Sequence, residues 1–234
     1  MQIVVLAGGR GTRLFPLTKD TPKSLIPILG KPFIEYQLEL FKSYGIDDVV
    51  LCVGYLADKI MKHLGDGGHF GLRIRYSVEK EPLGTAGALK RAQDLLDEEF
   101  LLTYGDSYLQ VDYADVLKYL KARDRLGVMV VYKNFDRFDR SNVVVEQGFV
   151  KAYDKSRKEP GMVYIDYGLS ALRKEALSII PRDTVMDLEC FYEALINTRQ
   201  LLAYEATKRF FEIGSPAGLS DFEDFASHAL LEVI

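Results

Sequence analysis

Residues 3–13 have the sequence Ile-Val-Val-Leu-Ala-Gly-Gly-Arg-Gly-Thr-Arg, and this stretch is the strongest indication of the fold. It begins with a run of four large apolar residues, which predicts a central parallel strand that is buried on both faces. The run ends in a loop with three glycines, Gly8, Gly9 and Gly11, which can turn backbone N–H groups towards a ligand. The two arginines of the loop and the nearby Lys23 add positive charge. We therefore expect a polyphosphate to bind at this turn.

Two common phosphate-binding motifs are absent from this stretch. The dinucleotide fingerprint requires glycine where this chain has Leu14. The P-loop requires glycine directly before its lysine, where this chain has Pro22. Pro22 and Pro27 instead bracket a stiff segment that disfavours helix and contains Lys23. The pattern predicts a strand, a glycine-rich turn and a fixed lysine that together clamp phosphate.

The pair of motifs LAGGRGTRL (residues 6–14) and PKSLIP (residues 22–27) resembles the signature of the sugar-1-phosphate nucleotidyltransferases, also called NDP-sugar pyrophosphorylases. The resemblance is closest to the guanylyltransferases of mannose 1-phosphate and of D-glycero-D-manno-heptose 1-phosphate. It implies an α/β fold with a Rossmann-like, doubly wound mixed sheet of the GT-A-like nucleotidyltransferase type. Many relatives continue into a C-terminal β-helix of hexapeptide repeats, which this sequence lacks. A glycine-rich turn in another α/β protein is the alternative interpretation.

Composition limits the class of protein. The 234 residues, with 48% hydrophobic and 27% charged residues, suit one globular domain. The net charge of −4 argues against a nucleic-acid partner. No signal-peptide pattern and no apolar run of about 20 residues is visible, so we expect a cytoplasmic protein without a membrane partner. The histidines lack metal-ligand spacing, which argues against zinc, and Cys52 and Cys190 are expected to be reduced and packed. The sequence leaves the oligomeric state open, and a homo-oligomer is compatible with it.

Hydrophobic periodicity predicts alternating strands and helices in the first half of the chain. The expected helices are 33–44, 57–64 and 84–96, and the expected strands after the first are 48–53, 70–78 and 100–104. This alternation predicts a doubly wound sheet that binds ligands at the carboxyl ends of its strands. The later ranges are helices 112–123, 173–179, 186–197 and one from 216, and strands 128–132, 142–146, 149–153, 162–171 and 201–205. We divide the single domain into a nucleotide-binding half, 1–127, and a sugar-phosphate half, 128–234.

The residues after the strand 70–78 are interpreted as a base-binding loop. Glu79 ends that strand, and Pro82, Gly84 and Thr85 precede or open the next helix. Glycine would let the backbone lie against a flat heterocycle, while Glu79 accepts hydrogen bonds from the base edge. A carboxylate can accept from both N1–H and N2–H of guanine, whereas uracil offers one such donor, so GTP is favoured. The alternative is a simple turn with a threonine cap.

Asp106 follows a glycine at the end of the predicted strand 100–104, where a carboxylate can bind Mg²⁺ together with substrate phosphates. An Asx turn is the alternative. The resemblance implies a second metal carboxylate within residues 210–216, and here that residue is Glu212, where the family usually has aspartate.

The resemblance also implies a sugar-phosphate site in the second half. Asp154 would hold a sugar hydroxyl and Lys155 the sugar phosphate, although a solvated surface pair is a rival interpretation. Asn142, Asp166 and Gly168 are expected in the same pocket. Asp166 departs from the small or amide residue of many relatives, which leaves the sugar open.

The implied reaction is Mg²⁺-dependent nucleotidyl transfer, in which a sugar 1-phosphate oxygen attacks the α-phosphorus of an NTP and pyrophosphate leaves. Arg13 would hold the β- and γ-phosphates, Lys23 would neutralise the α-phosphate, and Asp106 would hold the metal. The expected nucleotide-binding residues are Leu6, Ala7, Gly8, Gly9, Gly11, Thr12, Glu79, Pro82, Gly84 and Thr85.

Other functions stay open at this point. Within the enzyme class, UTP or CTP could replace GTP, and the acceptor could be a muramic acid phosphate, glucose phosphate or phosphocholine. A non-catalytic nucleotide-binding regulatory module would not need Asp106 and Glu212. A dinucleotide oxidoreductase is disfavoured, because Val53 and Gly54 stand where an acidic residue would follow the second strand.

Overall fold

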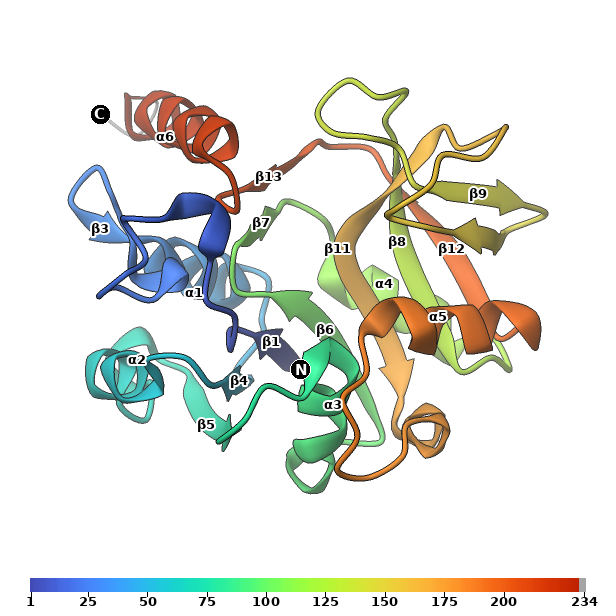
Figure 1. The fold of residues 1–234 in the computed structure, drawn as a ribbon, viewed down its shortest axis with the longest axis horizontal. Helices are drawn as coiled ribbons and strands as arrows, with labels where there is room; N and C mark the ends of the chain where they lie inside the picture. The colour runs from blue at the N-terminus through green and yellow to red at the C-terminus, as the bar shows by residue number, and fades with distance from the viewer. Residues whose placement is uncertain (232–234) are drawn as a thin grey trace.

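The computed structural model describes the backbone of residues 1–231 and the side chains through residue 228. Its main feature is one continuous sheet of nine strands, in the order β5-β4-β1-β6-β11-β8-β12-β10-β9 (Figure 1). The first half of the chain supplies four parallel strands, which are β1 (Gln2–Leu6), β4 (Asp48–Val53), β5 (Arg73–Val78) and β6 (Glu99–Tyr104). The predicted alternation of strands and helices is confirmed here.

The second half extends the same sheet and makes it mixed. Strand β11 (Tyr164–Arg173) runs antiparallel between β6 and β8 (Gly127–Lys133), and β12 (Leu201–Ala206) lies parallel to β8. The far edge is the hairpin of β9 (Val143–Glu146) and β10 (Phe149–Tyr153). Its turn residues have positive φ angles of 51° and 77°, as a Gln-Gly hairpin turn requires. The mixed, doubly wound sheet is confirmed.

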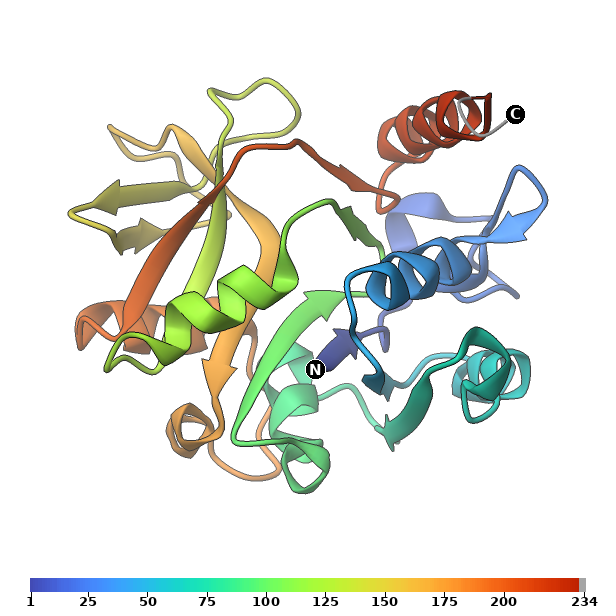
Figure 2. The same ribbon diagram turned by 180° about the vertical axis from the view of Figure 1, so that it is seen from behind.

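Helices cover both faces of the sheet. In Figure 1, α3 (Gly84–Arg91) and α5 (Leu188–Asn197) lie in front of it, and in Figure 2, α1 (Phe33–Ser43) and α4 (Tyr113–Lys121) do so. The helix α2 (Ala57–Leu64) packs on the same core as α1 and α4. Alternate residues of β1 enter the two cores, because successive side chains of a strand point to opposite faces.

The helix α6 (Pro216–Leu231) packs outside these layers, on a smaller aromatic core around Phe33 and Phe222. Before α6, a strand β13 (Phe210–Glu212) pairs antiparallel with a strand that the sequence did not predict, β7 (Ser107–Leu109). A second small hairpin joins β2 (Pro27–Ile28) and β3 (Lys31–Pro32).

Several predicted boundaries and one packing prediction are wrong. Residues 174–179 form a 3₁₀ helix, the helix α3 stops at Arg91, and β5 begins at Arg73 after a 3₁₀ turn. Cys52 is buried as expected, but Cys190 is exposed because it lies on the outer side of α5. Among residues 1–231, no helix has the length and apolar character needed to cross a membrane.

Candidate active site

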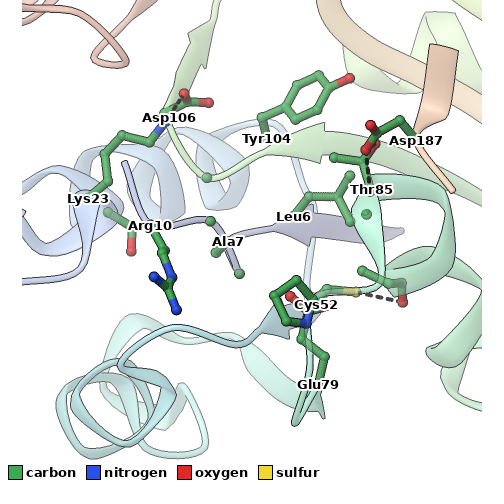
Figure 3. A pocket seen from close by; sticks show the side chains of 17 residues that line it. Leu6, Ala7, Arg10, Lys23, Cys52, Glu79, Thr85, Tyr104, Asp106 and Asp187 are labelled. Carbon is green, nitrogen blue, oxygen red and sulfur yellow. Dashed lines mark hydrogen bonds and ion pairs between the residues drawn. The ribbon is translucent and has the colours of Figure 1, made fainter. Parts of the chain in front are cut away.

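A cavity of about 430 Å³ opens at the carboxyl ends of β1, β5 and β6, beside the start of α3 (Figure 3). Strands β4 and β6 lie on opposite sides of β1, so this is a topological switch point of the sheet, where open α/β folds bind their ligands. Ten of the predicted site residues line it, namely Leu6, Ala7, Gly8, Gly9, Lys23, Glu79, Pro82, Gly84, Thr85 and Asp106.

The Glu79 side chain lies against Gly8, at the start of the glycine-rich loop. A Cβ added at Gly8 would lie 2.6 Å from Glu79 Oε1, and one added at Gly54 would lie 2.7 Å from the same atom. The other carboxylate oxygen accepts a hydrogen bond of 3.1 Å from the Leu83 N–H. The two glycines are therefore needed to admit this carboxylate, which marks one wall of the cavity.

Residues 11–13, at the end of the glycine-rich loop, set the direction of the chain but do not line the cavity. Gly11 adopts the left-handed backbone conformation with φ of 62°, and Thr18 Oγ1 donates to its carbonyl over 3.0 Å. A Cβ at Gly11 would lie 2.9 Å from the Thr18 side chain and 3.3 Å from Lys23 Cβ. Gly11 thus allows the loop to return Lys23 to the cavity, whereas the neighbouring Thr12 and Arg13 are exposed.

The metal residues predicted from distant parts of the chain lie together. The Lys23 ammonium forms an ion pair with Asp106. Pairing of β7 with β13 sets Glu212 opposite Ser107, next in sequence to Asp106. The Ile213 N–H donates to the Asp106 carbonyl over 2.9 Å. The small sheet therefore holds the two carboxylate-bearing segments side by side.

Gly214 marks the point at which three charged side chains converge. A Cβ added there would lie 2.6 Å from Glu212 Oε2, 2.7 Å from Arg13 Nη2 and 3.0 Å from Asp106 Oδ2. Two carboxylates at one point fit Mg²⁺, which takes one or two protein carboxylates and completes its shell with phosphate oxygens and water. Among the residues that the structure describes, no group of three or more His, Cys, Asp or Glu side chains could hold a metal ion.

The residues predicted to bind the sugar form a second cluster at a bulge in β11. The Asp166 N–H donates to Asn142 Oδ1 over 2.9 Å, and the Gly168 N–H donates to Asp166 Oδ1 over 3.0 Å. Gly168 has φ of 90°, which the bulge requires. The Tyr153 hydroxyl donates to Asp166 Oδ2 over 3.1 Å, and burial together with the Asp166 charge raises the pKa of this phenol, which therefore stays protonated.

Lys155 and Asp154 differ in what they contact. Lys155 Nζ lies 5.5 Å from the ring centroid of Tyr104, which lines the cavity. The Asp154 carboxylate instead accepts from the N–H groups of Arg157, at 2.8 Å, and Ser156, at 2.7 Å, and these bonds lower its pKa. Lys155 thus lies near a ring of the cavity wall but does not itself line the cavity, while Asp154 closes its own turn.

Arg10, which the sequence analysis counted as positive charge of the loop, also lines the cavity. Sequence reasoning missed several other lining residues, which are Ser24, Cys52, Ala88, Tyr104, Gly105 and Asp187. Tyr104 and Gly105 directly precede Asp106, so the strand-end rule that selected Asp106 could have found them. Asp187 comes from the other half of the chain, and no local pattern marks it. Burial and the Glu79 charge raise the pKa of Cys52 to about 12, so this thiol lines the cavity in its protonated form.

Comparison of the sequence with known proteins shows that the chain is similar to enzymes that transfer nucleotidyl groups. The family described as nucleotidyl transferase matches residues 2–145. The D-glycero-alpha-D-manno-heptose 1-phosphate guanylyltransferase of Campylobacter jejuni is 32% identical, over 92% of this chain and 96% of its own. The mannose-1-phosphate guanyltransferase of Schizosaccharomyces pombe is also 32% identical, and the match covers 92% of this chain but 61% of that protein.

Solved structures share the architecture. The structure of HddC from Yersinia pseudotuberculosis complexed with GMP-PN has a TM-score of 0.76 and 26% identity, over 94% of this chain and 96% of that chain. An inositol-1-phosphate CTP transferase from T. maritima has a TM-score of 0.79 at 23% identity, over 97% of this chain and 94% of that chain, and therefore supports the fold alone.

Proposed function

Because the chain belongs to the nucleotidyl transferase family, and is therefore an enzyme that transfers nucleotidyl groups, we propose that it joins the guanylyl group of GTP to a sugar 1-phosphate of the mannose or heptose type and releases pyrophosphate. One observation carries the proposal. A single cavity has the Glu79 carboxylate on one wall and the Lys23–Asp106 pair on another, which suits a base at one end and phosphates at the other.

The choice of GTP rests on Glu79. Its carboxylate is held against Gly8 and Gly54 and faces the base loop, where it can accept from both N1–H and N2–H of guanine. Two relatives that cover most of this chain are named for guanylyl transfer, and this agrees with the choice.

The proposed chemistry needs positioning and charge neutralisation, because a phosphate monoester oxygen is already ionised near pH 7. Arg13 would hold the β- and γ-phosphates of the leaving group, and Lys23 would neutralise charge at the α-phosphate. Lys155 would orient the incoming sugar phosphate. Asp106 and Glu212 would hold Mg²⁺, which when bound supplies further positive charge at the phosphate oxygens.

The sugar itself is assigned to the cluster at the β11 bulge. Asp166, Asn142 and Gly168 are joined there by hydrogen bonds, and Asp166 can accept from sugar hydroxyls. The choice of a heptose-type acceptor is supported by the Campylobacter relative, which the chain matches over nearly its full length.

The test is a substrate panel. The enzyme is incubated with Mg²⁺, each of the four NTPs in turn, and mannose, heptose, glucose or muramic acid 1-phosphates or phosphocholine, and pyrophosphate is measured. We expect the highest kcat/KM with GTP and a mannose- or heptose-type acceptor. Asp106→Asn and Glu212→Gln should each lower kcat by about 10²–10³, as loss of a charge contact at a transition state does. Glu146→Gln, on the exposed hairpin, is the matched control.

Three results would contradict parts of the proposal. No pyrophosphate from any pair of substrates would rule out the reaction. A preference for UTP or CTP would rule out the base assignment. Unchanged kcat in the Asp106 and Glu212 variants would rule out their role in holding the metal.

A further inference from the structure

Asp187 lines the nucleotide cavity although it belongs to the sugar-phosphate half of the chain. It stands at the N-cap position of α5, but its side chain forms no hydrogen bond to that helix. Its Oδ1 atom instead accepts from the Thr85 N–H, in the first turn of α3, over 3.2 Å. In return, Thr85 Oγ1 accepts from the Leu188 N–H, at the start of α5, over 2.7 Å. The two helices cap each other, and the exchange fixes the Asp187 carboxylate at the cavity wall.

The backbone around Asp187 is fitted closely to the base loop. The Met186 carbonyl accepts from the N–H groups of Ala86, at 2.9 Å, and Gly87, at 3.1 Å. Gly84 has φ of 71°, and a Cβ there would lie 2.5 Å from the Met186 carbonyl oxygen and 3.0 Å from Asp187 Oδ1. A side chain at Gly84 would therefore push Met186 and Asp187 away from α3 and move Asp187 out of the cavity wall.

The charges of the cavity limit what Asp187 can bind. A carboxylate repels phosphate, and the proposed phosphate end is formed by Lys23 and Asp106. Figure 3 shows Asp187 and Thr85 on the opposite side of the cavity from Lys23 and Asp106. Glu79 is assigned to the base, so the part of a nucleoside triphosphate left for Asp187 is the ribose. Its 2′- and 3′-hydroxyls are neutral donors, which a carboxylate accepts well.

We propose that Asp187 binds the ribose hydroxyls through its second carboxylate oxygen and so makes the enzyme select ribonucleotides over deoxyribonucleotides. This assignment rests on the proposed function, since it takes the cavity to hold a nucleoside triphosphate. Oδ1 stays on the Thr85 N–H, which leaves Oδ2 for the ligand.

The experiment compares GTP, 2′-deoxyGTP and 3′-deoxyGTP at saturating sugar 1-phosphate. We expect wild-type kcat/KM to fall about 10- to 100-fold for either deoxynucleotide, the factor typical of a hydrogen bond to a charged group. Asp187→Asn keeps an oxygen for the Thr85 N–H but replaces the other with an amide donor. In this variant, kcat/KM for GTP should exceed kcat/KM for either deoxynucleotide by less than about threefold, because only the value for GTP falls. A purely structural role would lower efficiency with all three nucleotides equally.

The matched control is Asp183→Asn. Asp183 lies on the same connection but outside the nucleotide cavity, and its φ of 54° is one that asparagine adopts readily. This variant should keep the wild-type ratio.

Equal wild-type use of GTP and deoxyGTP would overturn the proposal, and so would an equal loss with every nucleotide in Asp187→Asn. If no nucleotide is turned over, the proposed function fails separately. Calorimetric binding of GTP and 2′-deoxyGTP then decides the role of Asp187, and equal affinities overturn it.

Discussion

At the scale of single residues, the missing side chain of Gly214 sets the spacing of the charged groups. Arg13, Asp106 and Glu212 come from three separate segments, and all three reach within about 3 Å of the position that a Cβ at Gly214 would take. The same residue gives its N–H to Glu212 Oε2, at 2.5 Å. A small change at Gly214 would therefore move the proposed metal carboxylates without removing either.

We predict that Gly214→Ala lowers kcat by about 10²-fold, similar to loss of one charge contact, because the added methyl displaces these groups. Steady-state kinetics measures kcat, and the thermal midpoint checks folding. The control is Gly68→Ala, an exposed site where the Cβ would meet only the Asp66 side chain, at 3.2 Å. Wild-type kcat in Gly214→Ala would show that the convergence has no catalytic importance.

At the scale of elements, polar side chains join three neighbouring strands at their amino ends, opposite the end where the cavity opens. Asp48 begins β4 and is only 7% exposed. Its carboxylate accepts from Gln2 of β1 at 2.8 Å, from Arg73 of β5 at 3.0 Å and from Arg75 of β5 at 2.7 Å. One carboxylate thus links three strands. Burial raises the pKa of Asp48, but these hydrogen bonds and the arginine charges outweigh burial and hold it below its ordinary value.

The sign of the pH effect follows from this lowered pKa. Asp48 contributes stability fully above the pKa of the unfolded chain, about 3.9, and loses it as the pH falls through the lower folded value. We predict that Asp48→Asn lowers the free energy of unfolding at pH 7, and that its difference from wild type shrinks below about pH 4. Urea denaturation at several pH values measures this. Asp58→Asn, on the exposed side of α2, is the control, and a pH-independent difference for Asp48→Asn would contradict the assignment.

At the scale of the whole molecule, the two halves proposed to bind nucleotide and sugar phosphate share their interior. One core joins Ile3 and Val49 to Val128 and Ile165, and the other joins Val4 and Phe100 to Phe191. Strands β6 and β11 pair directly across the division between residues 127 and 128. The mutual caps of α3 and α5 cross it as well. Neither half has a closed core of its own.

We therefore predict that the chain unfolds in one cooperative transition, as a single domain does. Far-ultraviolet circular dichroism and tyrosine fluorescence should give superimposable urea curves, since the 14 tyrosines report on the whole molecule. Two separated transitions would contradict the single-domain assignment, as would a fragment of residues 1–127 that folds cooperatively alone.

Local features of the fold were predictable because their causes are local. The apolar run of β1 required burial, Asp112 caps α4 by accepting from the Asp115 N–H over 3.0 Å, and Gln147-Gly148 turns the β9–β10 hairpin. The strand β7 was missed because its three residues are too few for a periodic signal, and its partner β13 lies about a hundred residues later. The 3₁₀ form of residues 174–179 is a difference in hydrogen bonding that apolar spacing does not reveal.

The mixed α/β fold, the glycine-rich turn and the family could be predicted from the amino-acid sequence, because strand periodicity and short motifs depend on neighbouring residues. The set of groups that share the cavity became visible only in the folded structure. Gly84 was interpreted from sequence as a base contact, and in the structure its missing side chain leaves room for the Met186 carbonyl. Thr85 was considered as a cap for its own helix α3, but its hydroxyl caps α5. Asp187 enters the cavity because two helix N-termini meet there. Such meetings depend on how distant segments pack, and no short stretch of sequence encodes them.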